Sequence, residues 1–185
     1  MFIRTAKEDH EKYFELLKAC LIPRPIVLVS TLDEEGIYNV APFSSCTTVA
    51  TLPPMLCIAA GPYKGRKKDT VRNIELTHDF VVNIPDEKLA DKVLITAQPF
   101  PPEIDEFREA GLTALPGIEV TAPRVAEAPV QIECRLEKIL ELGEIPDYLI
   151  IGRILAFHVR EDLFNNYKID FDRLRPLGAM KRYWD

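Results

Sequence analysis

The chain has 185 residues, of which 47% are hydrophobic and 28% are charged, and its 29 Asp and Glu residues outnumber 23 Lys and Arg residues for a formal net charge of -6. This length and composition predict one soluble globular domain whose core needs no disulfides or structural metals. The acidic balance argues against general binding to nucleic acids or anionic membranes, which favour a positively charged protein, so any anion-binding site must be local.

The N-terminal residues 1–12 contain no apolar stretch long enough for a signal peptide or a membrane span, which favours a cytoplasmic protein. The four cysteines form no C-x-x-C pair and are expected to be buried free thiols. The three histidines are equally dispersed, so local spacing predicts no zinc or iron site.

The first element in chain order is a predicted amphipathic helix. Thr5 and Glu8 fit a capping box, and apolar residues recur at helical spacing from Tyr13 to Cys20. Pro23 marks the end of this helix. We expect residues 1–21 to cover a sheet, within a single domain that spans residues 1–185.

Strand signals dominate the rest of the chain. The first four predicted strands are short and closely spaced, which suggests a meander. Residues 130–137 alternate strictly between apolar and polar side chains, whereas residues 148–159 are apolar on both parities and should form a central strand covered on both faces. Strands are predicted over residues 25–32, 37–41, 42–49, 55–60, 80–84, 130–137 and 148–159.

Three short helices are predicted between these strands. The first follows a polar basic loop and should be capped by Asp69 or Thr70. The second carries an apolar stripe from Leu89 to Ala97, and the third has Gly111 at its C-cap. These helices span residues 69–76, 86–97 and 103–110. Because strands come first and last with helices inserted between them, we expect a mainly β fold, an antiparallel β-barrel with peripheral helices.

Four cations lie at residues 64–68 (KGRKK), directly before the first of these helices. Cations are unfavourable at a helix N-terminus, where the macrodipole places about half a positive charge, so a negative group should compensate them. A phosphate could accept hydrogen bonds from the first backbone N–H groups, from the Thr70 hydroxyl and from these side chains. The alternative is a solvated charged loop in which Asp69 simply caps the helix.

A second tract, residues 39–48 (NVAPFSSCTT), gathers small polar side chains beside a proline. A heteroaromatic ligand needs hydroxyl and backbone hydrogen-bonding groups around its edge, which such a tract can supply. The alternative is an exposed strand edge rich in Ser and Thr. Together the two tracts would offer a phosphate clamp and a polar rim for a planar ring, which suits a mononucleotide better than a dinucleotide.

Three common functional motifs are missing from the sequence. It contains no G-x-G-x-x-G of a Rossmann cofactor site, no G-x-x-x-x-G-K-[ST] of a P-loop and no G-x-S-x-G of a serine hydrolase. His158 is a candidate proton donor or ligand-stacking residue, although a lone histidine on an apolar strand is more often a hydrogen-bonded core or interface residue. Asp105 and Glu106 are expected to form a solvated helix face.

The order of several short motifs resembles that of the flavin reductase-like family of FMN-binding split β-barrels, the group that includes flavoredoxin. The resemblance runs from about residue 22 to the C-terminus. Its motifs are residues 23–31 (PRPIVLVST), 39–44 (NVAPFS), 53–54 (PP), 68–74 (KDTVRNI), 80–83 (FVVN), 105–107 (DEF), 111–113 (GLT), 127–130 (EAPV), 133–134 (EC) and 152–158 (GRILAFH).

This resemblance implies a six-stranded Greek-key barrel in a homodimer, with FMN bound noncovalently near the subunit interface and reduced by NADH, NADPH or a protein donor. Two departures from the family pattern stand out, Ser45-Cys46 in place of a common aromatic residue and an unusual ending at residues 180–184. By correspondence with the family motifs, the flavin site would comprise Ser30, Thr31, Asn39, Ala41, Pro42, Phe43, Ser44, Ser45, Arg66, Lys68, Thr70 and Asn73.

The functional prediction is an FMN-binding oxidoreductase of the NAD(P)H:flavin reductase type. One alternative is a flavoredoxin-like electron carrier between protein partners, without direct oxidation of NADH or NADPH. Another is a cofactor-free or haem-binding split barrel with a structural or sensing role. An absorption spectrum and a titration with reduced nicotinamide donors distinguish these functions.

Overall fold

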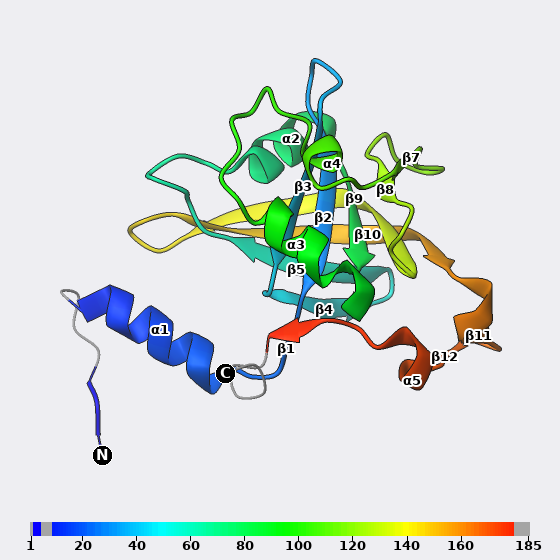
Figure 1. Cartoon of the computed structure of the whole chain (residues 1–185). Coiled ribbons are helices and arrows are strands. Elements are labelled where there is room, and N and C mark those ends of the chain that lie inside the picture. The colour runs from blue at the N-terminus through cyan, green and yellow to red at the C-terminus, as the bar shows by residue number, and fades with distance from the viewer. Residues whose placement is uncertain (1, 5–8, 180–185) are drawn as a thin grey trace.

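The structure is a computed structural model that describes residues 2–4 and 9–179 (Figure 1). Its centre is one antiparallel sheet of seven strands in the order β3-β2-β6-β9-β10-β5-β4. These strands are β2 (Val27–Leu32), β3 (Tyr38–Phe43), β4 (Cys46–Thr51), β5 (Pro54–Ala60), β6 (Asp79–Ile84), β9 (Val130–Leu142) and β10 (Asp147–Val159). The predicted mainly β fold is confirmed, with seven strands in the sheet where the family resemblance implied six.

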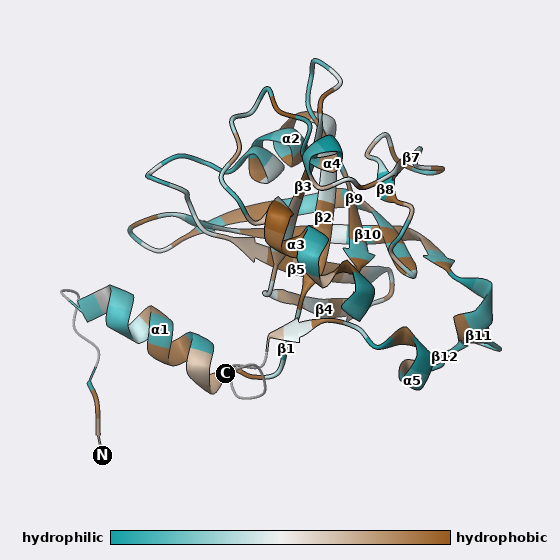
Figure 2. Ribbon diagram, in the orientation of Figure 1, coloured by the Kyte–Doolittle hydropathy of each residue, from teal (hydrophilic) through white to brown (hydrophobic). Residues whose placement is uncertain are grey.

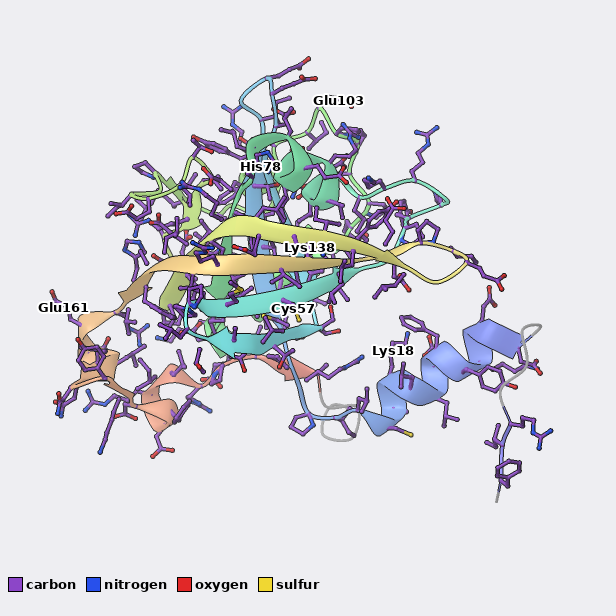
Figure 3. All side chains as sticks on the ribbon, turned by 180° about the vertical axis from the view of Figure 1, so that it is seen from behind. Lys18, Cys57, His78, Glu103, Lys138 and Glu161 are labelled. Atoms are coloured by element: carbon purple, nitrogen blue, oxygen red, sulfur yellow. The ribbon has the colours of Figure 1, made fainter. Side chains whose placement is uncertain are left out.

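The sheet is curved into a split barrel by the way its two edges are connected. Its edge strands, β3 and β4, follow one another in the chain and are separated only by Ser44 and Ser45. The sheet must therefore bend until its two edges approach each other. Figure 3 shows the sheet from behind, with Cys57 on β5 and Lys138 on β9.

The predicted meander of the first four strands is wrong. The hairpins β2–β3 and β4–β5 form as expected, but they lie at opposite ends of the sheet order. Strands β6, β9 and β10, which come later in the chain, separate them. Local spacing predicts a hairpin well, because the turn brings its two strands together, but it does not determine how one hairpin pairs with the next.

The barrel interior is packed with the apolar side chains of the central strands, including Val29, Ile58, Phe80 and Ile150. Phe80 lies directly against Gly152, where an added Cβ would be 2.3 Å from the Phe80 ring. A second apolar cluster, which includes Leu28 and Val40, lies on the other side of β2 and β3, against the helices. Strand β2 is thus buried on both faces, which explains its uninterrupted apolar and β-branched sequence.

Short helices and short strand pairs surround the barrel. Helix α2 contacts β2 and β3, while α3 and α4 contact β3, so all three lie near that edge of the sheet (Figure 1). The helices are α1 (His10–Cys20), α2 (Asp69–Thr77), α3 (Ala90–Thr96), α4 (Glu106–Glu109) and α5 (Phe171–Leu174), with short 3-10 turns at Glu87–Leu89 and Glu161–Leu163. The minor strands pair as β1 (Arg24–Pro25) with β13 (Gly178–Ala179), β7 (Ala114–Leu115) with β8 (Arg124–Val125), and β11 (Phe164–Asn165) with β12 (Lys168–Ile169).

Helix α1 forms, but it does not cover the sheet of its own chain. The helix stands beside the barrel, and Figure 2 shows hydrophobic residues along it with no other helix or strand of the described residues packed over them. Phe14 is 60% exposed and Leu17 is 53% exposed. The capping box at Thr5 and Glu8 and the unusual ending at residues 180–184 lie outside the described residues.

Two other predictions need correction. Strand β10 is central, between β9 and β5, but it is not covered on both faces, because Phe157 is 59% exposed. The helix expected at residues 86–97 begins with a 3-10 turn, and within its predicted apolar stripe Val93 is buried while Leu94 is exposed. Within the described residues, no helix is long and apolar enough to cross a membrane.

Candidate functional site

A cleft of about 960 Å³ opens between the start of α2, the strand β3 and the loop that joins α3 to α4. This volume lies within the usual range for small-molecule and cofactor sites, about 300 to 1,000 Å³. Its walls are formed by Asn39, Ala41, Pro42, Tyr63, Lys64, Arg66, Lys67, Lys68, Asp69, Thr70, Arg72, Thr96, Ala97, Gln98, Pro99, Phe100, Pro101, Pro102 and Glu106.

The cationic tract forms one wall of this cleft. Tyr63 and Arg66 exchange two backbone hydrogen bonds of 2.8 and 2.9 Å, which closes a tight turn. The two residues at its tip, Lys64 and Gly65, have φ angles of +49° and +73°. Glycine adopts this left-handed conformation without strain, so the KG pair suits the turn. The sequence prediction of a polar basic loop is confirmed, with this turn inside it.

The cations of the cleft divide into paired and unpaired groups. Lys67 Nζ lies 2.7 Å from Glu75, and Arg72 Nη1 lies 2.8 Å from Asp69. No salt bridge with a described carboxylate is formed by Lys64, Arg66 or Lys68. The Lys64 ammonium group lies 5.2 Å from the centre of the Tyr63 ring, and the Lys68 ammonium group lies 5.4 Å from the centre of the Phe43 ring. Positive charge is therefore available to an anion.

Helix α2 begins at this wall without a side-chain cap. The N-cap residue is Lys68, in an extended conformation, and no described side chain caps the first turn by a hydrogen bond. Neither Asp69 nor Thr70 is the cap that the sequence suggested, because both lie inside the helix and Asp69 pairs with Arg72. The positive end of the helix macrodipole thus faces a wall that already carries free cations.

A hydrogen-bonded network lies below this wall. In the orientation that satisfies its neighbours, the Asn39 amide oxygen accepts from the Thr31 and Thr70 hydroxyls at 3.2 Å, and its nitrogen donates to Glu106 Oε2 at 3.3 Å. Asn73 Nδ2 donates to the Thr31 hydroxyl at 3.0 Å. The network joins residues that the sequence proposed separately, but Thr31 and Asn73 are buried beneath the cleft and do not line it.

Glu106 is one of the cleft residues that sequence reasoning missed, together with residues 96–102 at the end of α3 and in the loop that follows it. It was expected on a solvated helix face, yet it turns inward and accepts a 2.7 Å hydrogen bond from Val40 N–H, while Asp105 caps α4. Burial raises the pKa of Glu106 to about 7, despite the hydrogen bond from Val40, and the nearby carboxylates of Asp69 and Asp105 add to this effect. No local pattern could have indicated it, because its partner is in β3.

The twelve predicted flavin-site residues divide into cleft residues and others. Ser30 is fully buried, where its hydroxyl donates to the Pro123 carbonyl and accepts from Asn83. Phe43 is buried, and the Ser45 hydroxyl bonds both backbone groups of Ala59. The predicted residues that line the cleft are Asn39, Ala41, Pro42, Arg66, Lys68 and Thr70, and those that do not are Ser30, Thr31, Phe43, Ser44, Ser45 and Asn73.

His158 lies outside the cleft and takes part in a structural network. Its Nε2 is 2.6 Å from Oε1 of Glu133, which is fully buried. Glu133 also accepts hydrogen bonds from the backbone N–H groups of Ile118, Glu119 and Val120. Burial raises the pKa of Glu133, but these backbone bonds and His158 outweigh it and hold the pKa below its usual value. His158 is therefore a hydrogen-bonded residue, as the alternative interpretation of the sequence had it, and it does not line the candidate site.

Solved structures and curated relatives resemble this chain over nearly its whole length. Nitrilotriacetate monooxygenase component B from Bacillus cereus superposes with a TM-score of 0.91 at 32% identity, covering 97% of this chain and 92% of that chain. For 2-nitrobenzoate 2-nitroreductase from Pseudomonas fluorescens the TM-score is 0.84 at 31% identity, with 96% and 88% covered. An uncharacterized protein from Aquifex aeolicus is 37% identical over 93% of this chain and 88% of its own length.

The family model of the flavin reductase like domain matches residues 19–178. This range contains every motif on which the sequence resemblance rested, together with the candidate cleft. The match confirms that resemblance, and the split barrel is the fold expected from it. The chain belongs to the flavin reductase-like family.

Proposed function

We propose that this protein is an FMN-binding oxidoreductase of the NAD(P)H:flavin reductase type. The observation that carries the proposal is the cleft itself, in which unpaired cations and an uncapped helix start adjoin an edge strand of the sheet. A phosphate monoester carries between about -1.5 and -2 charges at neutral pH and offers strong acceptor oxygens, which fits this wall. The residues present therefore fit the phosphate end of FMN.

Lys68 and Arg66 would hold the phosphate, together with the first N–H groups of α2. The Thr70 hydroxyl would join them by turning its O–H from the Asn39 oxygen to the phosphate. The ring would lie along β3, beside Asn39 and Pro42. Pro42 suits that position, because an edge strand is where a residue without an N–H is tolerated. FMN, when bound, supplies the transfer of hydride and electrons, and the chain supplies its position and the surrounding charge.

The proposal is tested by an absorption spectrum of the purified protein and by steady-state oxidation of NADH and NADPH with free flavin or ferric acceptors. We expect bound or readily reconstituted FMN and turnover with at least one nicotinamide donor. Flavin binding without any nicotinamide oxidation would contradict the reductase and favour the electron carrier between protein partners. A spectrum without flavin that FMN cannot restore would contradict both functions.

We also propose that the protein is a homodimer. The proposal is supported by the apolar side chains that one chain leaves exposed on α1 and at the end of β10, Phe14, Leu17 and Phe157. A second copy of the chain could bury them. Light scattering should give twice the mass of one chain, and Leu17→Ser should weaken the dimer. A monodisperse monomer at micromolar concentration would contradict this arrangement.

A cytoplasmic location is part of the same proposal. It is supported by the four free cysteines at Cys20, Cys46, Cys57 and Cys134, since free thiols are typical of a reducing compartment. Fractionation of cells that produce the protein should place it with soluble cytoplasmic proteins, whereas recovery from a membrane or secreted fraction would contradict the location.

A further inference from the structure

Glu106 is held in the wall of the cleft by one of its two oxygens. Its Oε2 accepts from Val40 N–H at 2.7 Å and from the Asn39 amide at 3.3 Å. Its Oε1 forms no hydrogen bond with any described residue. Among the described residues, Arg24 Nε is the only fully buried side-chain nitrogen or oxygen without a hydrogen-bond partner. Oε1 of Glu106 is therefore accessible to solvent, and Glu106 lines the cleft.

The charges around this carboxyl come from several elements. Asp105 lies beside it as the N-cap of α4, and Asp69 faces it from α2. Glu106 also lines a second, smaller cavity next to the cleft, to which Asp33 contributes from the turn between β2 and β3. Lys68 opposes these carboxylates. The remaining charged residues of the two cavities are Arg72, Lys64, Arg66 and Lys67, whereas α3 contributes the uncharged Thr96.

This balance makes the carboxyl sensitive to what occupies the cleft. The pKa of Glu106 is about 7 without a ligand, so the carboxyl is close to half ionised at neutral pH. A phosphate near Lys68 would offset the cation that now favours the ionised form. A planar ring in the cleft would also displace water and bring no positive charge. Both changes favour the neutral carboxyl.

We propose that binding of FMN in the cleft is coupled to the uptake of a proton from solvent by Glu106, whose neutral carboxyl then donates a hydrogen bond from Oε1 into the cleft. Oε2 can keep its hydrogen bond from Val40 N–H, so the change needs no movement of α4. The inference rests on the proposed function, because it requires that FMN occupy this cleft.

The coupling is measured by isothermal titration calorimetry of FMN into the flavin-free protein at pH 7.5, in buffers of different ionisation enthalpy. With a pKa of about 7 in the free protein, complete neutralisation takes up about three quarters of a proton per FMN. The Kd should also rise several-fold, up to about eightfold, between pH 7.5 and 8.5. The phosphate itself does not contribute, because its second pKa is about 6.

Glu106→Gln should bring the proton uptake close to zero and make the Kd independent of pH over this range. The glutamine keeps an acceptor for Val40 N–H. Glu109→Gln is the matched control, since Glu109 lies exposed on the same helix and outside the cleft, and it should behave like the wild type. Undiminished uptake in Glu106→Gln would overturn the inference.

A second readout on the wild type needs no variant. Infrared difference spectra at pH 8 should show the C=O stretch of a neutral carboxyl appearing when FMN binds. FMN binding with neither this band nor proton uptake would overturn the role of Glu106 and leave the proposed function standing. If FMN does not bind at any pH, the proposed function fails, and this inference fails with it.

Discussion

Removing the charge of Lys68 is the sharpest perturbation of the proposed phosphate site. Lys68 forms no salt bridge with a described carboxylate, and it stands at the N-cap of α2 in the wall of the cleft. A charge-assisted hydrogen bond contributes about 1.5 to 3 kcal/mol. Since about 1.4 kcal/mol corresponds to a tenfold change in affinity, Lys68→Ala should weaken FMN binding by roughly 10- to 100-fold. Arg66→Ala should cause a smaller loss, because Arg66 is exposed.

Titrations with FMN and with riboflavin at one fixed ionic strength separate the contribution of the phosphate to the binding affinity from that of the ring. The variants should lose affinity for FMN and keep their affinity for riboflavin, which lacks the phosphate. Lys67→Ala is the matched control, because Lys67 already pairs with Glu75, and it should change FMN affinity less than Lys68→Ala. Wild-type FMN affinity in both Lys68→Ala and Arg66→Ala, or an equal loss for riboflavin, would refute the reasoning.

Three further predictions concern the fold. Gly152→Ala should destabilise the protein by about 1 to 3 kcal/mol in urea unfolding, because its new Cβ would overlap the Phe80 ring; unchanged stability would contradict the packing. Glu133→Gln should cost about 1 to 3 kcal/mol at pH 7. The pKa of Glu133 is lowered in the folded protein, so its ionised form stabilises the fold above the unfolded-state pKa of about 4.3. The difference in unfolding free energy between wild type and Glu133→Gln should therefore shrink as the pH falls below about 4. A difference that stays constant down to about pH 3 would contradict this sign. Burial also raises the pKa of Cys134, so iodoacetamide at pH 8 should label exposed Cys20 and spare Cys134 in the folded protein, as mass spectrometry of the labelled peptides would show.

Much of the fold could be predicted because its signals are local. The alternation in residues 130–137 and the β-branched run before Leu32 are patterns within single strands, and both strands form. Strand β9 extends to Leu142, beyond the alternating pattern, because pairing with β10 continues it. The order of the two hairpins and the exposure of α1 depend on distant contacts, which no local pattern contains.

The candidate site, too, could be predicted only where its signals are local in the sequence. The cations before α2 were identifiable, because an excess of positive charge at a helix start is electrostatically unfavourable and can be seen in the sequence. Ser30 belongs to the same strand motif as Thr31, but its hydroxyl bonds the carbonyl of Pro123, which is distant in the chain. Glu106 enters the site only through Val40, a contact between α4 and β3. Sequence alone could therefore indicate the cationic wall of the cleft but not the carboxyl beside it.

The most direct test of the central claim is a crystal structure of the protein soaked with FMN. We expect the phosphate to lie against Lys68, Arg66 and the Thr70 hydroxyl at the start of α2, with the ring along β3 and beside Glu106. An empty cleft at saturating FMN, or an FMN phosphate bound away from the start of α2, would contradict the claim.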